Sequence, residues 1–220
     1  MTSDPHANQP VVQAGPALAK AAGAVILLHG RGASAEDILG LSEDFDLPEV
    51  AWLAPQAEGH TWYPYSFLSP IPQNEPWLRS ALQKVRQTVE QAMREGVARE
   101  RIVIAGFSQG ACLASEFVAR NAARFGGLIA FTGGLIGPPG TEFRYTGSLQ
   151  GTPAFFGAGD PDAHVPWQRV QESASVFTAL GADVLSRRYP GMGHTINRDE
   201  LEEARRMIAR AVQPVAGPRD

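Results

Sequence analysis

The amino-acid sequence predicts an α/β fold in which a mainly parallel sheet carries helices on both faces. Short apolar runs alternate with helical patterns along most of the chain, an order typical of parallel strands joined by helices. One such run, residues 101–106, passes into a helical pattern with almost no break. The chain has 220 residues, 44% of them hydrophobic, enough to bury the core of one domain. We therefore expect a single domain over residues 1–220, with frayed ends at 1–10 and 214–220.

Six apolar runs are predicted to form strands. They cover residues 24–30, 50–55, 101–106, 127–133, 153–159 and 183–190, and residues 11–15 are a weaker first candidate. Helical patterns lie between or after them at residues 34–41, 76–96, 109–124, 166–180 and 197–213. Ligands bind at the carboxyl ends of parallel strands, so the residues that directly follow these runs are the candidates for a functional site.

Ser108 lies between Gly106 and Gly110, where a predicted strand turns into a helix. Serine beside glycine is common in ordinary turns and at helix starts, so the pentapeptide GFSQG needs its context. A G-x-S-x-G sequence that joins a strand directly to a helix is typical of a nucleophile elbow, in which a strained serine projects its hydroxyl above the sheet. A Cβ at either glycine is expected to collide where strand and helix pass closely. We therefore predict that Ser108 is a catalytic nucleophile.

A serine nucleophile needs a neighbouring base, and histidine is the usual one. His194 follows the last predicted strand on a Gly-rich loop, where the hydrolase order of Ser, acid and His places the base. His6 lies in the segment expected to be frayed and His60 in a long aromatic loop, so neither is favoured. We expect His29 to hydrogen-bond its own loop and His164 to be a loop residue beside the site.

The other parts of a serine active site have candidates as well. Asp160 and Asp162 in the segment GAGDPDAHVP could each orient His194, and their spacing does not choose between them. An oxyanion hole requires backbone N–H groups aimed at the developing negative charge. We expect one from Gln109, the residue after the nucleophile, and one from Arg31 in the Gly-rich sequence LLHGRGAS.

Residues 56–76 form a long connection that is rich in aromatic residues and proline. Ligand pockets are lined mainly by apolar and aromatic side chains, so this loop is a candidate wall for an acyl or aromatic-alcohol site. The alternative for each aromatic residue is that it only packs the loop onto the body of the protein. The candidates for substrate binding are Trp62, Tyr63, Tyr65 and Phe67.

Composition and charge narrow the range of partners. The net charge is −4 and the 19 Lys and Arg are scattered, so no nucleic-acid partner is predicted. The single cysteine, Cys112, excludes an internal disulfide, and no sequence pattern of metal ligands occurs, so neither a metal nor another cofactor is predicted. No apolar run approaches the roughly 20 residues of a membrane span, and residues 1–10 lack signal-peptide features. We expect a soluble cytoplasmic protein; a homo-oligomer is compatible with these features.

Five segments together resemble the phospholipase/carboxylesterase family of small α/β hydrolases, which includes bacterial carboxylesterases and acyl-protein thioesterases. The segments are LHGRGAS, APQAEGHTWYPYSF, GFSQG, GDPDAHVP and YPGMGHTI, and the resemblance covers about residues 20–212. It implies the α/β-hydrolase fold. The family's G-x-x-D-x-x-V-P pattern falls on residues 159–166 and selects Asp162 over Asp160. The nucleophile falls on Ser108, the base on His194, and the oxyanion donors on Arg31 and Gln109.

The resemblance implies a serine carboxylesterase that hydrolyses small carboxylic esters through an acyl-enzyme. Acyl-thioesterase or lysophospholipase activity would use the same groups, and a catalytically silent ligand-binding relative is the alternative outside enzymes. The thioesterase members tend to carry an apolar residue and then Gly-Asp after the His-Gly pair, where this chain has Arg31, Gly32 and Ala33. The backbone donor survives that change, but a long charged side chain is expected at the mouth of the acyl pocket.

Overall fold

Seven strands form one mainly parallel sheet with helices on both faces, so the predicted fold class is confirmed. The structure is a computed structural model that describes residues 4–213; the predicted frayed ends at 1–3 and 214–220 lie outside the described residues. The strand order is β1-β3-β2-β4-β5-β6-β7, and only the pairing of β1 with β3 is antiparallel. The strands are β1 (Val11–Ala14), β2 (Gly23–Leu28), β3 (Val50–Pro55), β4 (Ile102–Phe107), β5 (Gly127–Phe131), β6 (Pro153–Asp160) and β7 (Asp183–Pro190).

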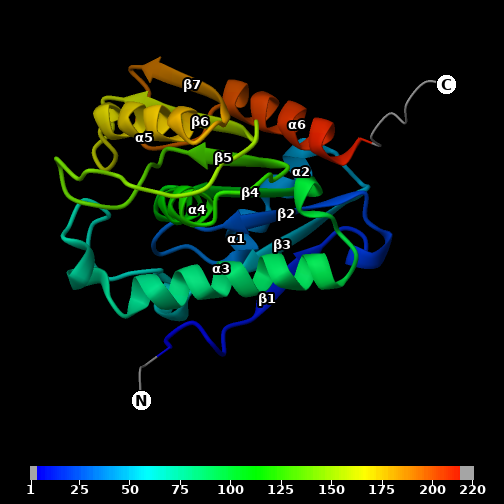
Figure 1. Cartoon of the computed structure of the whole chain (residues 1–220). Coiled ribbons are helices and arrows are strands. Elements are labelled where there is room, and N and C mark those ends of the chain that lie inside the picture. Colours follow the sequence, from blue (N-terminus) through cyan, green and yellow to red (C-terminus); the bar gives the residue numbers. More distant parts are fainter. Residues whose placement is uncertain (1–3, 214–220) are drawn as a thin grey trace.

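The helices divide into two layers, one on each face of the sheet (Figure 1). They are α1 (Ala35–Leu39), α2 (Leu41–Phe45), α3 (Trp77–Arg94), α4 (Gln109–Arg120), α5 (Trp167–Ala179) and α6 (Arg198–Val212). Buried side chains of α3, α4 and α5 share one apolar cluster, and those of α1, α2 and α6 share the other. Successive residues of β2 enter opposite clusters, Ile26 the first and Leu27 the second, because side chains alternate across a strand. The continuous apolar runs in the sequence follow from this burial on both faces.

The predicted helix over residues 34–41 is replaced by two short helices that meet at Gly40. Ser34 begins α1 with a capping box, in which its hydroxyl accepts from the Asp37 N–H and the Asp37 carboxylate accepts from the Ser34 N–H. Gly40 keeps right-handed helical dihedrals, with φ of −51° and ψ of −31°, but glycine is a weak helix former and the helix is interrupted there. The second helix ends at Asp46, which adopts a left-handed conformation with φ of 47°.

Residues 4–10 contact the body of the protein, so the expectation that residues 1–10 are frayed is wrong for this part of the segment. His6 is fully buried; its N–H donates to Ser80 Oγ at 2.9 Å, and its ring contacts the rings of Trp62 and Trp77. Asp4 accepts a hydrogen bond from the same Ser80 hydroxyl. The polar composition of this segment concealed the buried histidine that anchors it.

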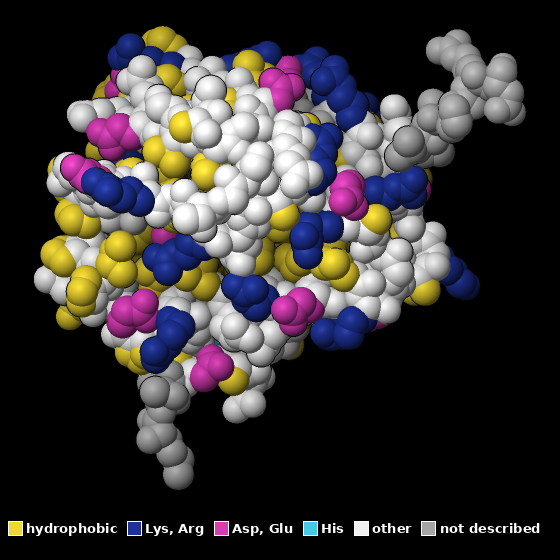
Figure 2. Space-filling view, in the orientation of Figure 1, with side chains coloured by type: hydrophobic (Ala, Val, Ile, Leu, Met, Phe, Trp, Pro, Cys, Tyr) yellow, Lys and Arg dark blue, Asp and Glu magenta, His cyan; other side chains and the backbone are white. Residues whose placement is uncertain are grey.

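Loops at the carboxyl ends of the parallel strands surround the site described below. The loop between β3 and α3, cyan to teal in Figure 1, is the long aromatic connection anticipated from the sequence. Figure 2 shows Lys and Arg interspersed with Asp and Glu over the face in view, without a field of one sign. Within residues 4–213, no helix is long and apolar enough to cross a membrane.

Candidate active site

Ser108 stands in a strained turn between β4 and α4. Its backbone has φ of 55° and ψ of −117°, a combination that residues with a side chain rarely adopt. The turn is as tight as predicted: an ideal Cβ on Gly106 would lie 2.5 Å from Gly110 C, and one on Gly110 would lie 2.0 Å from Leu28 O. Two hydrogen bonds stabilise this strained backbone: the Ser108 N–H donates to Phe131 O at 3.0 Å, and the Ser108 carbonyl accepts from the Cys112 N–H at 3.0 Å. This backbone directs the hydroxyl into the space above the sheet.

Three side chains from distant parts of the sequence form a hydrogen-bonded chain at this point. The Ser108 Oγ lies 2.8 Å from His194 Nε2, and His194 Nδ1 lies 2.8 Å from Asp162 Oδ2. The Asp162 carboxylate accepts a hydrogen bond from the Nδ1–H, which leaves Nε2 as the acceptor for the serine hydroxyl. The Asp162 side chain is fully buried and that of His194 is 21% exposed, so the imidazole is accessible to a ligand while the carboxylate is shielded.

The environment of Asp162 keeps it ionised. Burial alone raises the pKa of its carboxyl, but hydrogen bonds from the Val165 and His164 N–H groups and from His194 outweigh burial, and the net pKa is lower than usual. Those N–H groups lie 2.8 and 2.7 Å from Asp162 Oδ1. Asp160, the other candidate, instead pairs with Arg188. The structure therefore brings Asp162 to His194, as the family pattern implied, and leaves Asp160 outside the chain of hydrogen bonds.

The two backbone N–H groups expected to form an oxyanion hole flank the serine. Gln109 is the first residue of α4, so its N–H has no acceptor within the helix and lies at the positive end of the helix dipole. The loop that carries Arg31 passes directly beside the elbow, because an ideal Cβ on Gly30 would lie only 3.6 Å from Ser108 Cβ. Within residues 4–213, neither the Gln109 nor the Arg31 N–H donates a backbone hydrogen bond outside helices and strands.

The serine and histidine open into a cavity of about 650 Å³. Three of the four aromatic residues proposed from the sequence, Tyr63, Tyr65 and Phe67, line it. Trp62 does not: it is fully buried, its Nε1–H donates to His29 O at 2.9 Å, and its ring packs against the rings of His6 and His29. The expectation that Trp62 faces the substrate is therefore corrected, since its position suits support of the loop from beneath.

Other lining residues were not singled out from the sequence as substrate contacts. Phe107 and Val165 are neighbours in sequence of the serine and the acid, so the motifs themselves could have indicated them. Cys112, one helical turn after the elbow, lies at the cavity although its side chain is buried, and burial raises the pKa of its thiol to about 12. The remaining members are Gly30, Arg31, Ala33, Pro64, Ser66, Ser108, Gln109, His164 and His194.

The remaining histidines have structural surroundings. His29 is buried; its Nδ1 donates to Gly30 O at 2.8 Å and its Nε2 accepts from the Ala57 N–H at 3.1 Å, as expected for a residue that holds its loop. Burial lowers the pKa of His29, which matches its role as an acceptor. The His164 ring meets the His194 ring edge-on, with 4.8 Å between centroids. No group of three or more His, Cys, Asp or Glu among residues 4–213 is arranged to hold a metal ion.

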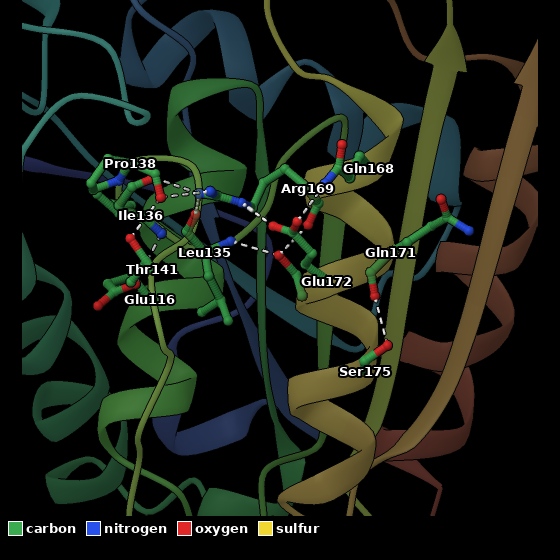
Figure 3. A network of polar contacts seen from close by, with 12 residues as sticks. Glu116, Leu135, Ile136, Pro138, Thr141, Gln168, Arg169, Gln171, Glu172 and Ser175 are labelled. Atoms are coloured by element: carbon green, nitrogen blue, oxygen red, sulfur yellow. Dashed lines mark hydrogen bonds and ion pairs between the residues drawn. The ribbon is translucent and has the colours of Figure 1, made fainter.

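Behind the aromatic wall, a second loop supports Phe67. Arg169 of α5 donates to Leu135 O, Gly137 O and Pro138 O and pairs with Glu172, as Figure 3 shows in part. The same loop reaches the wall through the Gly137 N–H, which donates to Phe67 O at 2.8 Å. The buried guanidinium also lies 6.0 Å from the centroid of the Phe67 ring. The Phe67 backbone is thus fixed by the Gly137 N–H, and its ring lies beside the Arg169 guanidinium.

Comparison with known proteins finds relatives similar in sequence and in fold. The sequence model described as phospholipase/carboxylesterase matches residues 7–212. A crystal structure of a phospholipase/carboxylesterase from Dyadobacter fermentans is 44% identical, has a TM-score of 0.88, and is matched over 92% of this chain and 97% of that one. The Bacillus cereus carboxylesterase shares the fold, with a TM-score of 0.73 at 21% identity over 93% of this chain and 95% of its own.

Among proteins compared by sequence, a probable SOBER1-like carboxylesterase of Arabidopsis thaliana is 25% identical over 81% of this chain and 74% of its own length. An acyl-protein thioesterase 1 of Gibberella zeae is 30% identical, but the match covers only 57% of this chain and 54% of that protein's length. The similarities thus include proteins named for ester hydrolysis and proteins named for thioester hydrolysis.

Proposed function

The chain belongs to the phospholipase/carboxylesterase family, and from that premise we propose that it is a serine carboxylesterase acting on small carboxylic esters. The observation that carries the proposal is the chain of hydrogen bonds from Ser108 through His194 to Asp162, with 2.8 Å at each step, at the wall of a cavity large enough for a small ester. A buried ionised acid, a histidine with Nε2 free to accept, and a serine in a strained turn are the parts that acyl transfer requires.

The first half of the reaction forms an acyl-enzyme. Ser108 Oγ attacks the ester carbonyl carbon while His194 Nε2 takes its proton, and Asp162 stabilises the imidazolium. The carbonyl oxygen becomes negative and accepts hydrogen bonds from the backbone N–H groups of Arg31 and Gln109. The tetrahedral intermediate then collapses: the bond to the alkoxy oxygen breaks, and that oxygen leaves as an alcohol with the proton from His194. The acyl group remains on the serine.

Water completes the cycle through the same groups. A water molecule that enters from the cavity gives a proton to His194 Nε2 and attacks the acyl carbon, and a second tetrahedral intermediate forms in the same oxyanion hole. Its collapse breaks the bond to Ser108 Oγ, which recovers a proton from His194, and a carboxylic acid is released. The strained backbone of Ser108 is suited to this cycle because it keeps the hydroxyl within reach of the base in both halves.

Thioester hydrolysis is the second candidate, supported by the similarity to acyl-protein thioesterases. It would use the same nucleophile, base and oxyanion donors, and differ only in the leaving group. A series of p-nitrophenyl esters and acyl thioesters of graded chain length compares the two through kcat/KM. The cytoplasmic location and the absence of a nucleic-acid partner remain predictions.

Labelling with a fluorophosphonate tests whether the protein is a serine hydrolase at all. We expect the purified protein to be labelled on Ser108 and to hydrolyse p-nitrophenyl esters. Ser108→Ala should lose both the label and the activity while its unfolding temperature stays the same. Triad serines typically contribute several orders of magnitude to kcat, so a variant with more than about a tenth of the original kcat would contradict the assignment. Ser175→Ala, on the exposed side of α5, is the matched control. A silent ligand-binding protein would show no label on Ser108.

A further inference from the structure

The side chain of Arg31 crosses from the loop after β2 to the aromatic loop after β3. Nη1 donates to Thr61 Oγ1 at 3.0 Å and to Pro64 O at 2.9 Å, and Nη2 donates to Tyr63 O at 2.9 Å and to Tyr65 O at 2.8 Å. All four terminal N–H groups of the guanidinium therefore have acceptors on a five-residue stretch. None of the ion pairs formed by residues 4–213 includes Arg31, so its partners are neutral oxygens. The charged side chain expected at the pocket mouth is therefore bound to three carbonyl oxygens and one hydroxyl of the aromatic loop.

Gln109, the second proposed oxyanion residue, also binds this stretch with its side chain. The Gln109 side chain is buried; its Oε1 accepts from the Trp62 N–H at 2.9 Å and its Nε2 donates to Tyr63 O at 2.8 Å. The carbonyl of Tyr63 therefore accepts from both Arg31 and Gln109. Two residues whose backbone N–H groups are assigned to the oxyanion hole thus bind residues 61–65 with their side chains.

The backbone around Arg31 has little stiffness of its own. Residues 29–34 are neither helix nor strand, and Arg31 lies between Gly30 and Gly32, of which the second has φ of 81°. Glycine restricts the backbone least of all residues. The loop is instead fixed by contacts with the preceding part of the aromatic connection: the Gly32 N–H donates to His60 O at 2.8 Å, and the His60 ring bonds Ala33 O at 2.9 Å. The position of the Arg31 N–H therefore depends on the aromatic loop.

Oxyanion stabilisation is sensitive to this position, because the donors must lie about 2.7 to 3.1 Å from the oxyanion. We propose that the Arg31 guanidinium is a positioning group for catalysis. It ties residues 61–65 to the loop of residues 29–34, and so fixes the Arg31 N–H relative to the aromatic wall of the cavity. This inference rests on the proposed function and extends it to a side chain that does not touch the reacting atoms. Lysine cannot replace it, because an ammonium on a flexible stem cannot reproduce a planar fork with four directed N–H groups.

The test uses substitutions that keep the backbone N–H and remove the fork. Arg31→Met and Arg31→Lys are compared with the unsubstituted protein by kcat and KM for a short p-nitrophenyl ester and by the affinity for butylboronic acid, whose tetrahedral serine adduct places an oxygen in the oxyanion hole. We expect kcat to fall about 10- to 100-fold in Arg31→Met, with an equal fall in boronic acid affinity and a much smaller change in KM. Arg198→Met, at an exposed pair with Glu202, is the matched control and should change none of these.

Two further measurements separate positioning from a general loss of structure. A double-mutant cycle with Gln109→Met should be non-additive in kcat, because both side chains hold residues 61–65. Ethylguanidinium added to Arg31→Ala should restore part of kcat by occupying the same carbonyl oxygens, which a collapsed or unfolded site would not allow. If Arg31→Met does not fold, the test uses kcat and boronic acid affinity of Arg31→Lys together with the ethylguanidinium rescue.

The inference is overturned if the folded variants keep kcat and boronic acid affinity, or if only KM rises, which would make Arg31 a substrate contact. Failure of the proposed function is recognised separately, since the unsubstituted protein would then show neither fluorophosphonate label on Ser108 nor ester turnover.

Discussion

The nucleophile elbow and the aromatic loop face each other across one cavity, but different forces hold them. The elbow is fixed by steric contact within a few residues: strand, Ser108 and helix have no room for a side chain at Gly106 or Gly110. The aromatic loop has no such local constraint. The side chains of Arg31 and Gln109 both donate to its Tyr63 carbonyl. Arg169 holds residues 135–138, from which the Gly137 N–H donates to the Phe67 carbonyl.

This difference indicates how the site divides its tasks. The chemistry rests on a short rigid segment, where an error of a fraction of an ångström would be costly. The shape of the cavity rests on contacts between residues far apart in sequence, which can be altered one at a time without disturbing the elbow. Substitutions of Ser108, Asp162 or His194 should therefore change kcat, and substitutions of loop side chains that line the cavity should change substrate preference or stability. Arg31 differs from both groups, because its guanidinium joins the loop to a proposed oxyanion N–H, and its loss should lower kcat.

The largest of these effects is expected for Asp162, the proposed acid that orients His194 beside the elbow. Asp162→Asn should lower kcat about 10³- to 10⁴-fold, because an amide at this position no longer holds the His194 tautomer in which Nε2 accepts from Ser108. Asp160→Asn is the matched control, since this residue pairs with Arg188 away from the histidine. Steady-state kinetics on a p-nitrophenyl ester measures both. Equal losses in the two variants would show that Asp162 has no special role.

A moderate effect is expected where the loop meets the cavity. Phe67→Ala should change the ratio of kcat/KM between long and short esters by about 10-fold or more, because it removes apolar contact area from the wall. Trp62→Phe should leave that ratio unchanged and lower the free energy of unfolding by about 1–3 kcal/mol, because His29 O loses its buried donor. Chain-length series and denaturant unfolding distinguish the two residues. A changed ratio in Trp62→Phe would return that residue to the binding surface.

The sequence predicted the elbow side far better than the loop side, and the two kinds of constraint explain why. Gly106, Ser108 and Gly110 lie within five residues, and their spacing itself carries the steric requirement. The strands from β2 to β6 were recognisable because burial on both faces produces continuous apolar runs, whereas β7 is only partly buried. The choice of Asp162 needed the family pattern, since Asp160 differs from it only in where the folded chain places it.

The contacts that set the loop could not be found in this way. Arg31 donates to carbonyl oxygens 32 to 34 positions away, and a carbonyl has no signature in the sequence. His6 illustrates the same limit: a polar N-terminal segment predicts fraying, whereas one buried ring docks it against Trp62. The buried position of Trp62 between His6 and His29 follows from these contacts rather than from its hydrophobicity, which made it equally suited to the cavity wall.

The smallest effect is expected from pH and concerns His6, which supports the loop from its far side. His6 Nδ1 accepts from the Glu58 N–H at 3.0 Å and its Nε2 donates to Trp62 O at 3.0 Å, an arrangement that only the neutral ring can make. Burial lowers the pKa of His6 from its usual value of 6.5, although Asp4 and Glu58 oppose this and Lys84 adds to it. The folded protein therefore binds fewer protons at this site than the unfolded chain, so the contribution of neutral His6 is complete above pH 6.5 and is lost as the pH falls toward the lowered pKa.

His6→Gln isolates this contribution, because an amide has both a donor and an acceptor but does not titrate in this range. Urea unfolding at pH 7.5 and at intervals down to pH 5 should show a shallower loss of stability in the variant than in the unsubstituted protein. Some loss remains in both, since the pKa of buried His29 is lowered as well and His29 accepts from the Ala57 N–H in the same loop. Identical pH profiles would show that protonation of His6 does not weaken the folded protein, and the support of the aromatic loop would then lie with Arg31, Gln109, His29 and, through residues 135–138, Arg169.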